Sequence, residues 1–354
     1  MKTDTNNILT IPVIVIYAPT ATGKTALILK LFGKGSHSFF NGKAELISAD
    51  SMQVYRGMNI GTAKPSTEEQ NELPHHLIDV CDINEQFSVA EFVERADNLC
   101  SEIYAKGKIP VIAGGTGFYI RNFILGLPKT PESNPLIREK LKNRLEQEGS
   151  EILYQELQNV DPDSARKIHI NDSYRILRAL EVFYSTGKPR SFFEMNNNHR
   201  SKYKFLILVP ERNRTDLYER INMRVEQMFA DGLENEVKKL IADGAKVSDP
   251  GMQAIGYREW FFNSDIDVIK EEIKKNSRRY AKKQYTYIKG IENACIIEFD
   301  SEKEFEVFVE GLERKPQQFK VVSHYGLADG RHIARVKKQY NANKFMEKDG
   351  DKYE

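Results

Sequence analysis

The sequence predicts an α/β fold, in which a parallel sheet flanked by helices is interrupted by an all-helical insertion. Apolar, β-branched segments alternate with helical segments in the first third of the chain, and this alternation is typical of parallel βαβ units. Residues 128–135 are rich in proline, and only helical periodicity and charge are visible from Leu136 to Tyr184. A strand pattern returns at Phe205–Val209. We therefore expect a core of residues 8–127 and 205–300, an inserted subdomain of 128–204, and an unassigned C-terminal tail of 301–354.

The individual elements follow from short apolar runs and from the helix formers between them. Strands are expected at Ile11–Tyr17, Glu45–Ala49, Ile109–Ala113, Phe205–Val209 and Ala294–Phe299. Helices are expected over Thr25–Phe32, Val89–Lys106, Leu217–Ala242 and Ile269–Ile288. Ligands of such sheets bind at the carboxyl ends of the strands, so the loops after the first three strands are the candidate site.

Composition narrows the class of protein. Lysine and arginine number 52 and aspartate and glutamate 51 among 354 residues, a net charge of +1, so any polyanion must be bound by a local patch. The three cysteines show no CxxC spacing, which argues against a cysteine zinc site and a disulfide framework. The apolar run 8–18 is far shorter than the roughly 20 residues of a membrane helix. We expect a cytoplasmic protein with no membrane partner.

A phosphate-binding loop is expected directly after the first strand. The segment fits the pattern GxxxxGK[ST], except that alanine occupies the first position, and it comprises Ala18, Pro19, Thr20, Ala21, Thr22, Gly23, Lys24 and Thr25. Backbone N–H groups at the start of the following helix can hold phosphate oxygens, Lys24 adds charge, and the Thr25 hydroxyl can hold Mg²⁺. This context predicts a P-loop NTPase-like core. The pattern leaves open a triphosphate, a diphosphate or a plain strand-to-helix turn.

Two further candidate residues follow the second and third strands. Asp50 could bind Mg²⁺ through water, act as a general base, or cap a following helix. The glycine-rich segment 114–117 could place its backbone and the Thr116 hydroxyl against the same ligand, or could be a simple turn. The base-reading motif NKxD of GTPases is absent, which disfavours a GTPase and leaves an ATPase or kinase open.

A basic segment supplies the local patch that the net charge requires. Residues 274–289 contain seven basic side chains and three tyrosines among sixteen positions. Basic groups pair with phosphates and aromatic rings stack on bases, a combination expected for looped or single-stranded nucleic acid. Arg220 and Arg224 share one face of another expected helix. Both features are also compatible with ordinary solvated helix surfaces.

Seven segments, read in order, strongly resemble the bacterial type of the tRNA dimethylallyltransferase (isopentenyltransferase) family. They are APTATGKT, ISADSMQVYRGMNIGTAKP, GGTGFYIRNFILGL, HINDSYRILRALEVFYSTGKP, RVEQMFADGLENEV, QAIGYREW and RRYAKKQYTYIKG. The resemblance runs from about Val13 to Lys289. The chain departs from the family pattern at Ala18, usually glycine, and at Tyr287, commonly tryptophan. The C-terminal zinc finger of eukaryotic members is missing.

The resemblance implies transfer of a dimethylallyl group from dimethylallyl diphosphate to N6 of the adenosine 3′ of the anticodon, in tRNAs reading codons that begin with U. Asp50 would accept the N6 proton, Thr116 and Arg224 would contact the diphosphate, and the phosphate loop would bind it with Mg²⁺ at Thr25. The implied tRNA contacts are Asp50, Ser51, Met52, Gln53, Arg138, Tyr174, Arg175, Ile176, Leu177, Arg178, Gln253, Gly256, Tyr257, Arg258, Arg278, Arg279, Lys282 and Lys283. The insertion would hold the anticodon stem-loop, and we expect a monomer.

Two other readings of the residues remain open at this stage. An adenylate isopentenyltransferase would use the same phosphate loop and Asp50 on a free nucleotide, but would not need the basic helix or the insertion. A P-loop ATPase or kinase acting on RNA, or a non-catalytic RNA-binding switch, would need no prenyl donor. Turnover of ATP without that donor would favour the last class.

Overall fold

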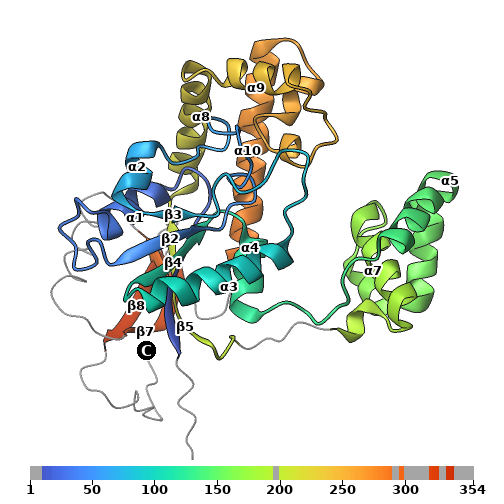
Figure 1. Ribbon diagram of the computed structural model, residues 1–354, viewed down its shortest axis with the longest axis horizontal. Helices are drawn as coiled ribbons and strands as arrows, with labels where there is room; N and C mark the ends of the chain where they lie inside the picture. The colour runs from blue at the N-terminus through green and yellow to red at the C-terminus, as the bar shows by residue number, and fades with distance from the viewer. Residues whose placement is uncertain (1–9, 194–198, 289–294, 299–318, 327–331, 339–354) are drawn as a thin grey trace, which may run out of the picture. The chain divides into compact units, whose positions relative to one another are not determined.

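The computed structural model describes residues 10–193, 199–288, 295–298, 319–326 and 332–338. It divides the chain into two compact units, one formed by the chain up to Ile124 and again from Ser201, the other by Leu125–Arg200. The sequence placed the boundaries of the insertion at 128 and 204, three and four residues later. The first unit carries the sheet and the candidate strand-end loops (Figure 1).

The first unit is built on a six-stranded sheet with the order β3-β2-β4-β1-β5-β6. Its strands are β1 (Ile11–Tyr17), β2 (Ala44–Ser48), β3 (His75–His76), β4 (Ile109–Gly114), β5 (Tyr203–Glu211) and β6 (Cys295–Glu298). Every neighbouring pair is parallel, which confirms the predicted fold class. Strand β3 was missed, because two residues cannot display an alternating pattern.

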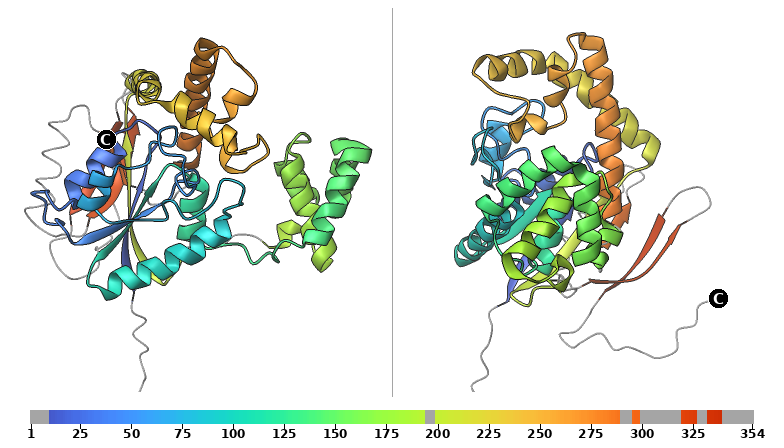
Figure 2. Two further views of the ribbon diagram at one scale, coloured as in Figure 1. Left: turned by 45° about the horizontal axis from the view of Figure 1, so that its top comes forward. Right: turned by 90° about the vertical axis from the view of Figure 1, so that its right-hand side faces the viewer.

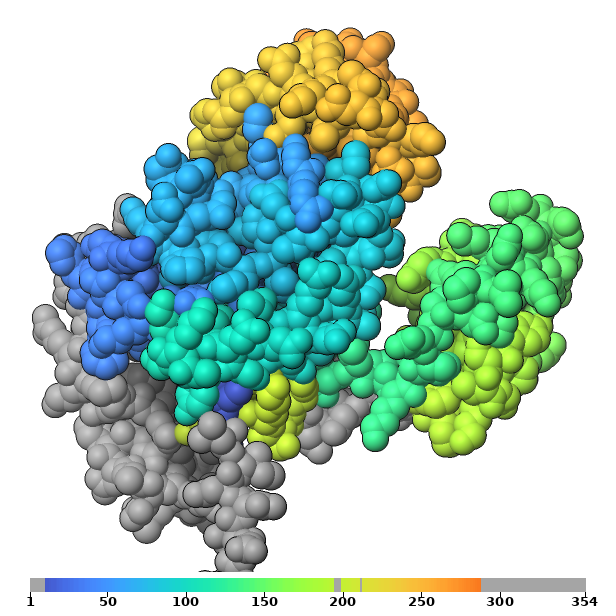
Figure 3. Space-filling model, viewed as in Figure 1, coloured from blue at the N-terminus to red at the C-terminus, as the bar shows by residue number. Residues whose placement is uncertain are grey.

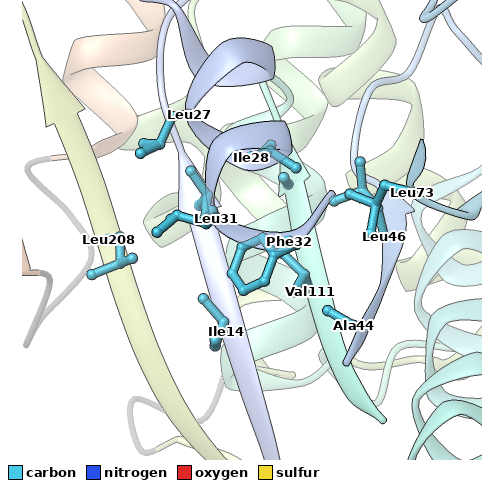
Figure 4. Packing of buried hydrophobic residues seen from close by; sticks show 12 residues of the cluster. Ile14, Leu27, Ile28, Leu31, Phe32, Ala44, Leu46, Leu73, Val111 and Leu208 are labelled. Carbon is cyan, nitrogen blue, oxygen red and sulfur yellow. The ribbon is translucent and has the colours of Figure 1, made fainter. Parts of the chain in front are cut away.

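Helices cover both faces of this sheet. Helices α1 (Lys24–Phe32) and α3 (Val89–Ala105) lie on opposite sides (Figure 2). The remaining helices between β2 and the insertion are α2 (Thr67–Glu72) and α4 (Gly117–Leu125). Figure 4 shows apolar side chains of α1 directed at the sheet. This cluster includes Leu27, Ile28, Leu31, Phe32, Ile14, Leu46 and Val111, all at most 8% exposed. Burial of this face fixes the start of α1, and with it the phosphate loop, over the end of β1.

One buried carboxylate on β2 predicts acid sensitivity of the fold. Glu45 is 4% exposed and pairs with Lys108 at 2.8 Å, His76 at 2.8 Å and Lys106 at 3.2 Å. Burial by itself raises its pKa, but these hydrogen bonds and charges outweigh it and lower the pKa to about 2. Because the folded pKa is depressed, the stabilisation is present above the unfolded value of about 4.3 and is lost as pH falls toward 2.

We expect Glu45→Gln to reduce the loss of unfolding free energy between pH 6 and pH 3 by roughly 1–3 kcal/mol. Urea unfolding at both pH values measures this difference. The matched control is Glu94→Gln, which removes an exposed carboxylate of α3 and should preserve the acid sensitivity of the parent. Identical pH dependence in Glu45→Gln and the parent would contradict the assignment.

Three further helices extend the first unit beyond the strand ends. They are α8 (Arg214–Ala230), α9 (Leu233–Ala242) and α10 (Ile266–Ile288), with short 3-10 turns at Gly251–Gln253 and Arg258–Phe261. The sequence predicted a single helix where α8 and α9 lie. Gly232 has φ 96°, a left-handed conformation that suits glycine and interrupts the helix. Leu217 and Ile221 of α8 pack against Ala281 of α10.

The second unit is entirely helical in its described part. It contains α5 (Pro135–Val160), α6 (Pro162–Lys167), α7 (Ser173–Thr186) and a 3-10 turn at Arg190–Phe192. Helix α5 is kinked at Gly149, where φ is 85°. The apolar core of the second unit is formed mainly by residues of α5, α6 and α7, among them Leu153, Leu157 and Leu180.

Beyond the sheet, the structure describes one antiparallel hairpin in the tail 301–354, formed by β7 (Phe319–Gly326) and β8 (His332–Lys338). No element was expected there from the sequence. Across the described residues, every helix falls short of the combined length and apolar character needed to cross a bilayer.

Candidate active site

A cavity of about 1050 Å³ lies at the carboxyl ends of the strands in the first unit. The loops after β1, β2 and β4 contribute to its lining, together with α8, α10 and the turn at Gly251–Gln253. From the phosphate loop, the lining includes Pro19, Thr20, Ala21, Gly23, Lys24 and Thr25. The loops predicted from the sequence therefore lie at the edge of the sheet where this cavity is found.

The phosphate loop is closed by local contacts that suit its sequence. Gly23 precedes α1 with φ 91°, a conformation that favours glycine. The Thr22 hydroxyl donates to the Pro19 carbonyl oxygen at 2.8 Å. Ala18, which replaces the usual glycine, is fully buried at the end of β1, so its methyl group is accommodated inside the protein.

Two cations in the cavity have no hydrogen-bond or ion-pair partner among the described residues. Burial lowers the pKa of Lys24 to about 8; Asp50 opposes this shift and Arg224 adds to it. Burial also lowers the pKa of Arg224, again opposed by Asp50. Both residues are half-buried, and because partly desolvated cations without a counter-ion are costly, this arrangement favours an anionic ligand between them, as expected for a diphosphate.

Asp50 combines a local structural contact with an available oxygen. Its Oδ1 accepts from the backbone N–H of Met52 at 2.9 Å and of Gln53 at 3.4 Å. These bonds close a turn and not a helix, so the helix-cap alternative is wrong. No bond to Oδ2 is present in the described part of the chain, and Asp50 lines the cavity. Its second oxygen is therefore available to accept a proton.

Thr116 lies beside the cavity but outside its lining. The Thr116 hydroxyl accepts from the Ser51 backbone N–H at 2.9 Å and donates to the Ser51 Oγ at 3.2 Å. Its own N–H donates to the Ala49 carbonyl oxygen at 3.1 Å. Thr116 thus ties the loop after β4 to the Asp50 loop, and the diphosphate contact expected from the resemblance remains a prediction.

The basic side chains of α10 lie in two different environments, the cavity and a contact with α8. Arg279, Lys282 and Lys283 line the cavity. Arg278 does not, because its guanidinium donates to the Asn222 side chain of α8 at 2.5 Å. Three of the four predicted basic contacts are therefore arranged around the same opening as the phosphate loop.

Of the other residues predicted to contact tRNA in the first unit, some line the cavity and others are buried in the protein. Ser51, Met52, Gln53, Gln253 and Arg258 line the cavity. Tyr257 is fully buried, and its hydroxyl donates to Glu236 at 2.5 Å. The Gly256 N–H donates to Glu259 at 2.9 Å. Packing removes the Tyr257 ring from the surface, and the tRNA contact implied for this residue stays a prediction.

In the helical unit, the segment 174–178, predicted to contact tRNA, has exposed residues on one face of α7 and buried residues on the other. Ile176 and Leu177 are 0% and 5% exposed in the apolar core, so their side chains are withdrawn from the surface, and the tRNA contacts implied for both stay predictions. Arg138 lies over the ring of the exposed Tyr174, 4.8 Å from its centroid, and Arg175 is exposed. Arg138 and Arg178 each lie 3.0 Å from Glu181, whose carboxylate is completely buried.

Sequence reasoning missed two residues that shape the cavity. Glu236 of α9 accepts from the backbone N–H groups of Asn59, Ile60 and Gly61 at 3.0–3.4 Å, which holds the segment after β2 against α9 (Figure 3). Gln284 of α10 is 3% exposed and bonds two strand-end loops. Gln284 was overlooked because it lies within the basic segment 274–289, which was interpreted from its charged and aromatic residues.

The comparison with known proteins decides the family. The sequence model of the IPP transferase family matches residues 53–291. This chain belongs to the IPP transferase family. Its relatives include the tRNA dimethylallyltransferase of Sulfurihydrogenibium sp. (strain YO3AOP1), 46% identical over 299 residues that cover 83% of this chain and 93% of that protein. The counterpart from Caldanaerobacter subterraneus is 41% identical over 310 residues, covering 85% and 96%.

Solved structures agree with this assignment of an IPP transferase. The full-length tRNA isopentenylpyrophosphate transferase of Bacillus halodurans is 35% identical, with a TM-score of 0.59, and the match covers 86% of this chain and 96% of that one. A eukaryotic dimethylallyltransferase acting on tRNA is 25% identical, with a TM-score of 0.66 and 92% of each chain covered. The predicted family and the predicted P-loop NTPase-like fold are both confirmed.

Proposed function

We propose that this IPP transferase moves a dimethylallyl group from dimethylallyl diphosphate to N6 of the adenosine immediately 3′ of the anticodon, in tRNAs that read codons beginning with U. That it is a tRNA-prenylating enzyme follows from its family and from the activity for which its relatives are named. The observation that supports the detailed reaction is the placement of Asp50 in one cavity with two unpartnered cations, Lys24 and Arg224.

The phosphate loop is the site we propose for the diphosphate. Lys24 and Arg224 would neutralise its charge, which grows on the leaving oxygen as the C–O bond breaks, and fixed cations stabilise that charge most where water is excluded. The described residues contain no cluster of three or more His, Cys, Asp and Glu residues able to cage a metal. This fits Mg²⁺, which is commonly bound by substrate phosphates and few protein groups. The Thr25 hydroxyl would hold it, and the ion would supply further charge neutralisation.

The chemical step needs one base and a displaced adenine. The N6 nitrogen attacks C1 of the dimethylallyl group, the C1–O bond breaks, and diphosphate leaves with the bonding electron pair. The Asp50 Oδ2 accepts the proton that N6 loses, because its Oδ1 is already occupied by the turn. The adenine must leave the stacked loop to reach this carboxylate. Because the substrate is tRNA, we propose that the enzyme acts in the cytoplasm, and we keep the expectation of a monomer as a separate proposal.

Labelled dimethylallyl diphosphate, Mg²⁺ and unmodified tRNA test the proposal together. We expect the label in N6-dimethylallyladenosine at the position 3′ of the anticodon, located by nuclease digestion and mass spectrometry. Efficient prenylation of AMP in place of tRNA would establish the free-nucleotide alternative. Hydrolysis of ATP without prenyl donor would instead support the ATPase or kinase reading.

Removing the basic side chains of α10 tests the proposed RNA surface. We expect the quadruple change of Arg278, Arg279, Lys282 and Lys283 to alanine to weaken tRNA binding and flatten its salt dependence. Each lost phosphate contact should lower the slope of log K against log salt by about 0.7–0.9. Because Arg278 bonds Asn222, restoring Arg278 to the variant should change the slope little. Filter binding at several salt concentrations measures this, and a slope equal to the parent's would refute the surface.

A further inference from the structure

The side chain of Gln284 bridges two loops that the proposed reaction needs in a fixed relation. Its Nε2 donates to the Gly115 carbonyl oxygen at 2.7 Å, and its Oε1 accepts from the Thr20 backbone N–H at 3.1 Å. Thr20 lies in the phosphate loop, and Gly115 precedes Thr116. Because one partner is a backbone donor and the other a backbone acceptor, only one orientation of the amide satisfies both.

The chain makes room for this bridge at Gly115. A Cβ atom at Gly115 would lie 2.4 Å from the Gln284 Nε2, and no other atom outside the adjacent residues comes within 3.5 Å. The φ angle of Gly115 is not in the left-handed region, so its backbone does not itself demand glycine. A side chain at Gly115 would therefore displace the Gln284 amide.

The bridge also connects both loops to the helix that carries the basic side chains. The backbone carbonyl oxygen of Gln284 accepts from the Tyr17 hydroxyl at 2.9 Å, and Tyr17 is fully buried at the end of β1. Arg279, Lys282 and Lys283 line the cavity from this same helix. On the other side, Thr116 is bonded to Ser51, the neighbour of Asp50. One buried amide thus links the diphosphate side, the base side and α10.

We propose that Gln284 is a positioning residue, which sets the phosphate loop, the Gly115–Thr116 turn and α10 in the register required for prenyl transfer. This inference rests on the function proposed above. Gln284 lines the cavity, but the Oε1 and Nε2 atoms of its amide are bonded to main-chain groups of the two loops, and we assign its role to these bonds. Its Thr20 contact consumes a loop N–H that would otherwise be available to a phosphate, so its effect is on geometry and not on charge.

Gln284→Met keeps the length of the side chain and removes both hydrogen bonds, and Gln284→Glu places an acceptor against the Gly115 carbonyl oxygen. Gly115→Ala displaces the amide without changing it. Since misplacement of about 1 Å can cost about 10²-fold in rate, we expect each variant to lose about 10- to 100-fold in kcat. KM values for tRNA and dimethylallyl diphosphate should stay within about 5-fold, because Lys24, Arg224 and the basic residues remain. Gln227→Met, at an exposed glutamine of α8, is the matched control.

A double-mutant cycle separates positioning from general damage. If Gly115→Ala acts by displacing Gln284, the double variant Gly115→Ala/Gln284→Met should be no slower than the slower single variant. Rates are normalised to active enzyme, and thermal unfolding confirms that each variant is folded. Additive losses, or kcat values within 3-fold of the parent, would overturn the proposal. Losses confined to KM would overturn it as well.

Hydrogen exchange provides a readout that does not depend on the reaction. In the parent, the Thr20 amide should exchange slowly, and in Gln284→Met the peptide containing it should exchange at least 10-fold faster. Unchanged exchange would refute the bridge. Should the parent prenylate no tRNA, the proposed function fails, and the exchange result alone decides whether Gln284 fixes the loops.

Discussion

Replacing Asp50 with alanine is expected to slow prenyl transfer by about 10²–10⁴-fold, the usual contribution of a positioned general base. The expected loss is in kcat, because Asp50 is proposed to act on the N6 proton as the C–N bond forms. Affinity for tRNA should fall far less. Single-turnover rates with saturating tRNA and dimethylallyl diphosphate isolate the chemical step from binding and release.

Asp50→Asn distinguishes the base from the turn. The amide oxygen of asparagine can still accept from the Met52 N–H, which Oδ1 accepts at 2.9 Å in the parent, but the side chain cannot take up the N6 proton at neutral pH. We therefore expect Asp50→Asn to retain the stability of the parent and to be nearly as slow as Asp50→Ala. If Asp50 served only the turn, Asp50→Asn would be fully active and Asp50→Ala would cost about 1 kcal/mol of stability.

Most of the sheet could be predicted because its strands are apolar runs followed by distinctive loops. The run 11–17 lies in β1, and the segment after it forms the expected loop before α1. The rest depends on contacts that periodicity does not encode. Strand β3 forms because His75 and His76 pair beside Leu46 and Ile47, and two residues carry no pattern. The break between α8 and α9 depends on the φ of Gly232.

The site was predictable where a motif lies at a strand end and less so where a segment lies on a helix. Asp50 and Lys24 follow β2 and β1, and parallel topology brings them to the same edge. A helical segment instead alternates between faces, so Ile176 points into the core while Tyr174 remains exposed. The role of Gln284 could not be predicted from the sequence. It depends on two hydrogen bonds to backbone groups that only the folded chain brings next to this side chain.

Lys24→Ala is expected to lower kcat/KM for dimethylallyl diphosphate by about 10²–10³-fold, comparable with loss of a fixed donor to developing negative charge. ATP should not be consumed stoichiometrically by the parent or the variant. One ATP hydrolysed for each prenyl group transferred would overturn the assignment of this loop to a leaving diphosphate.

The pH dependence of binding tests the same residue from its electrostatics. Burial lowers the pKa of Lys24 to about 8 in the free protein, and a bound diphosphate should raise it again, since an adjacent anion favours the charged ammonium. Affinity for dimethylallyl diphosphate should therefore be constant well below pH 8 and fall as pH rises from 8 to 10, with proton uptake on binding in that range. Isothermal titration calorimetry in buffers of different ionisation enthalpy measures both quantities. Lys24→Ala removes the titrating group, so its weaker binding should lose this pH step. A step of equal size in the variant would assign the titration to another group and remove Lys24 from the diphosphate site.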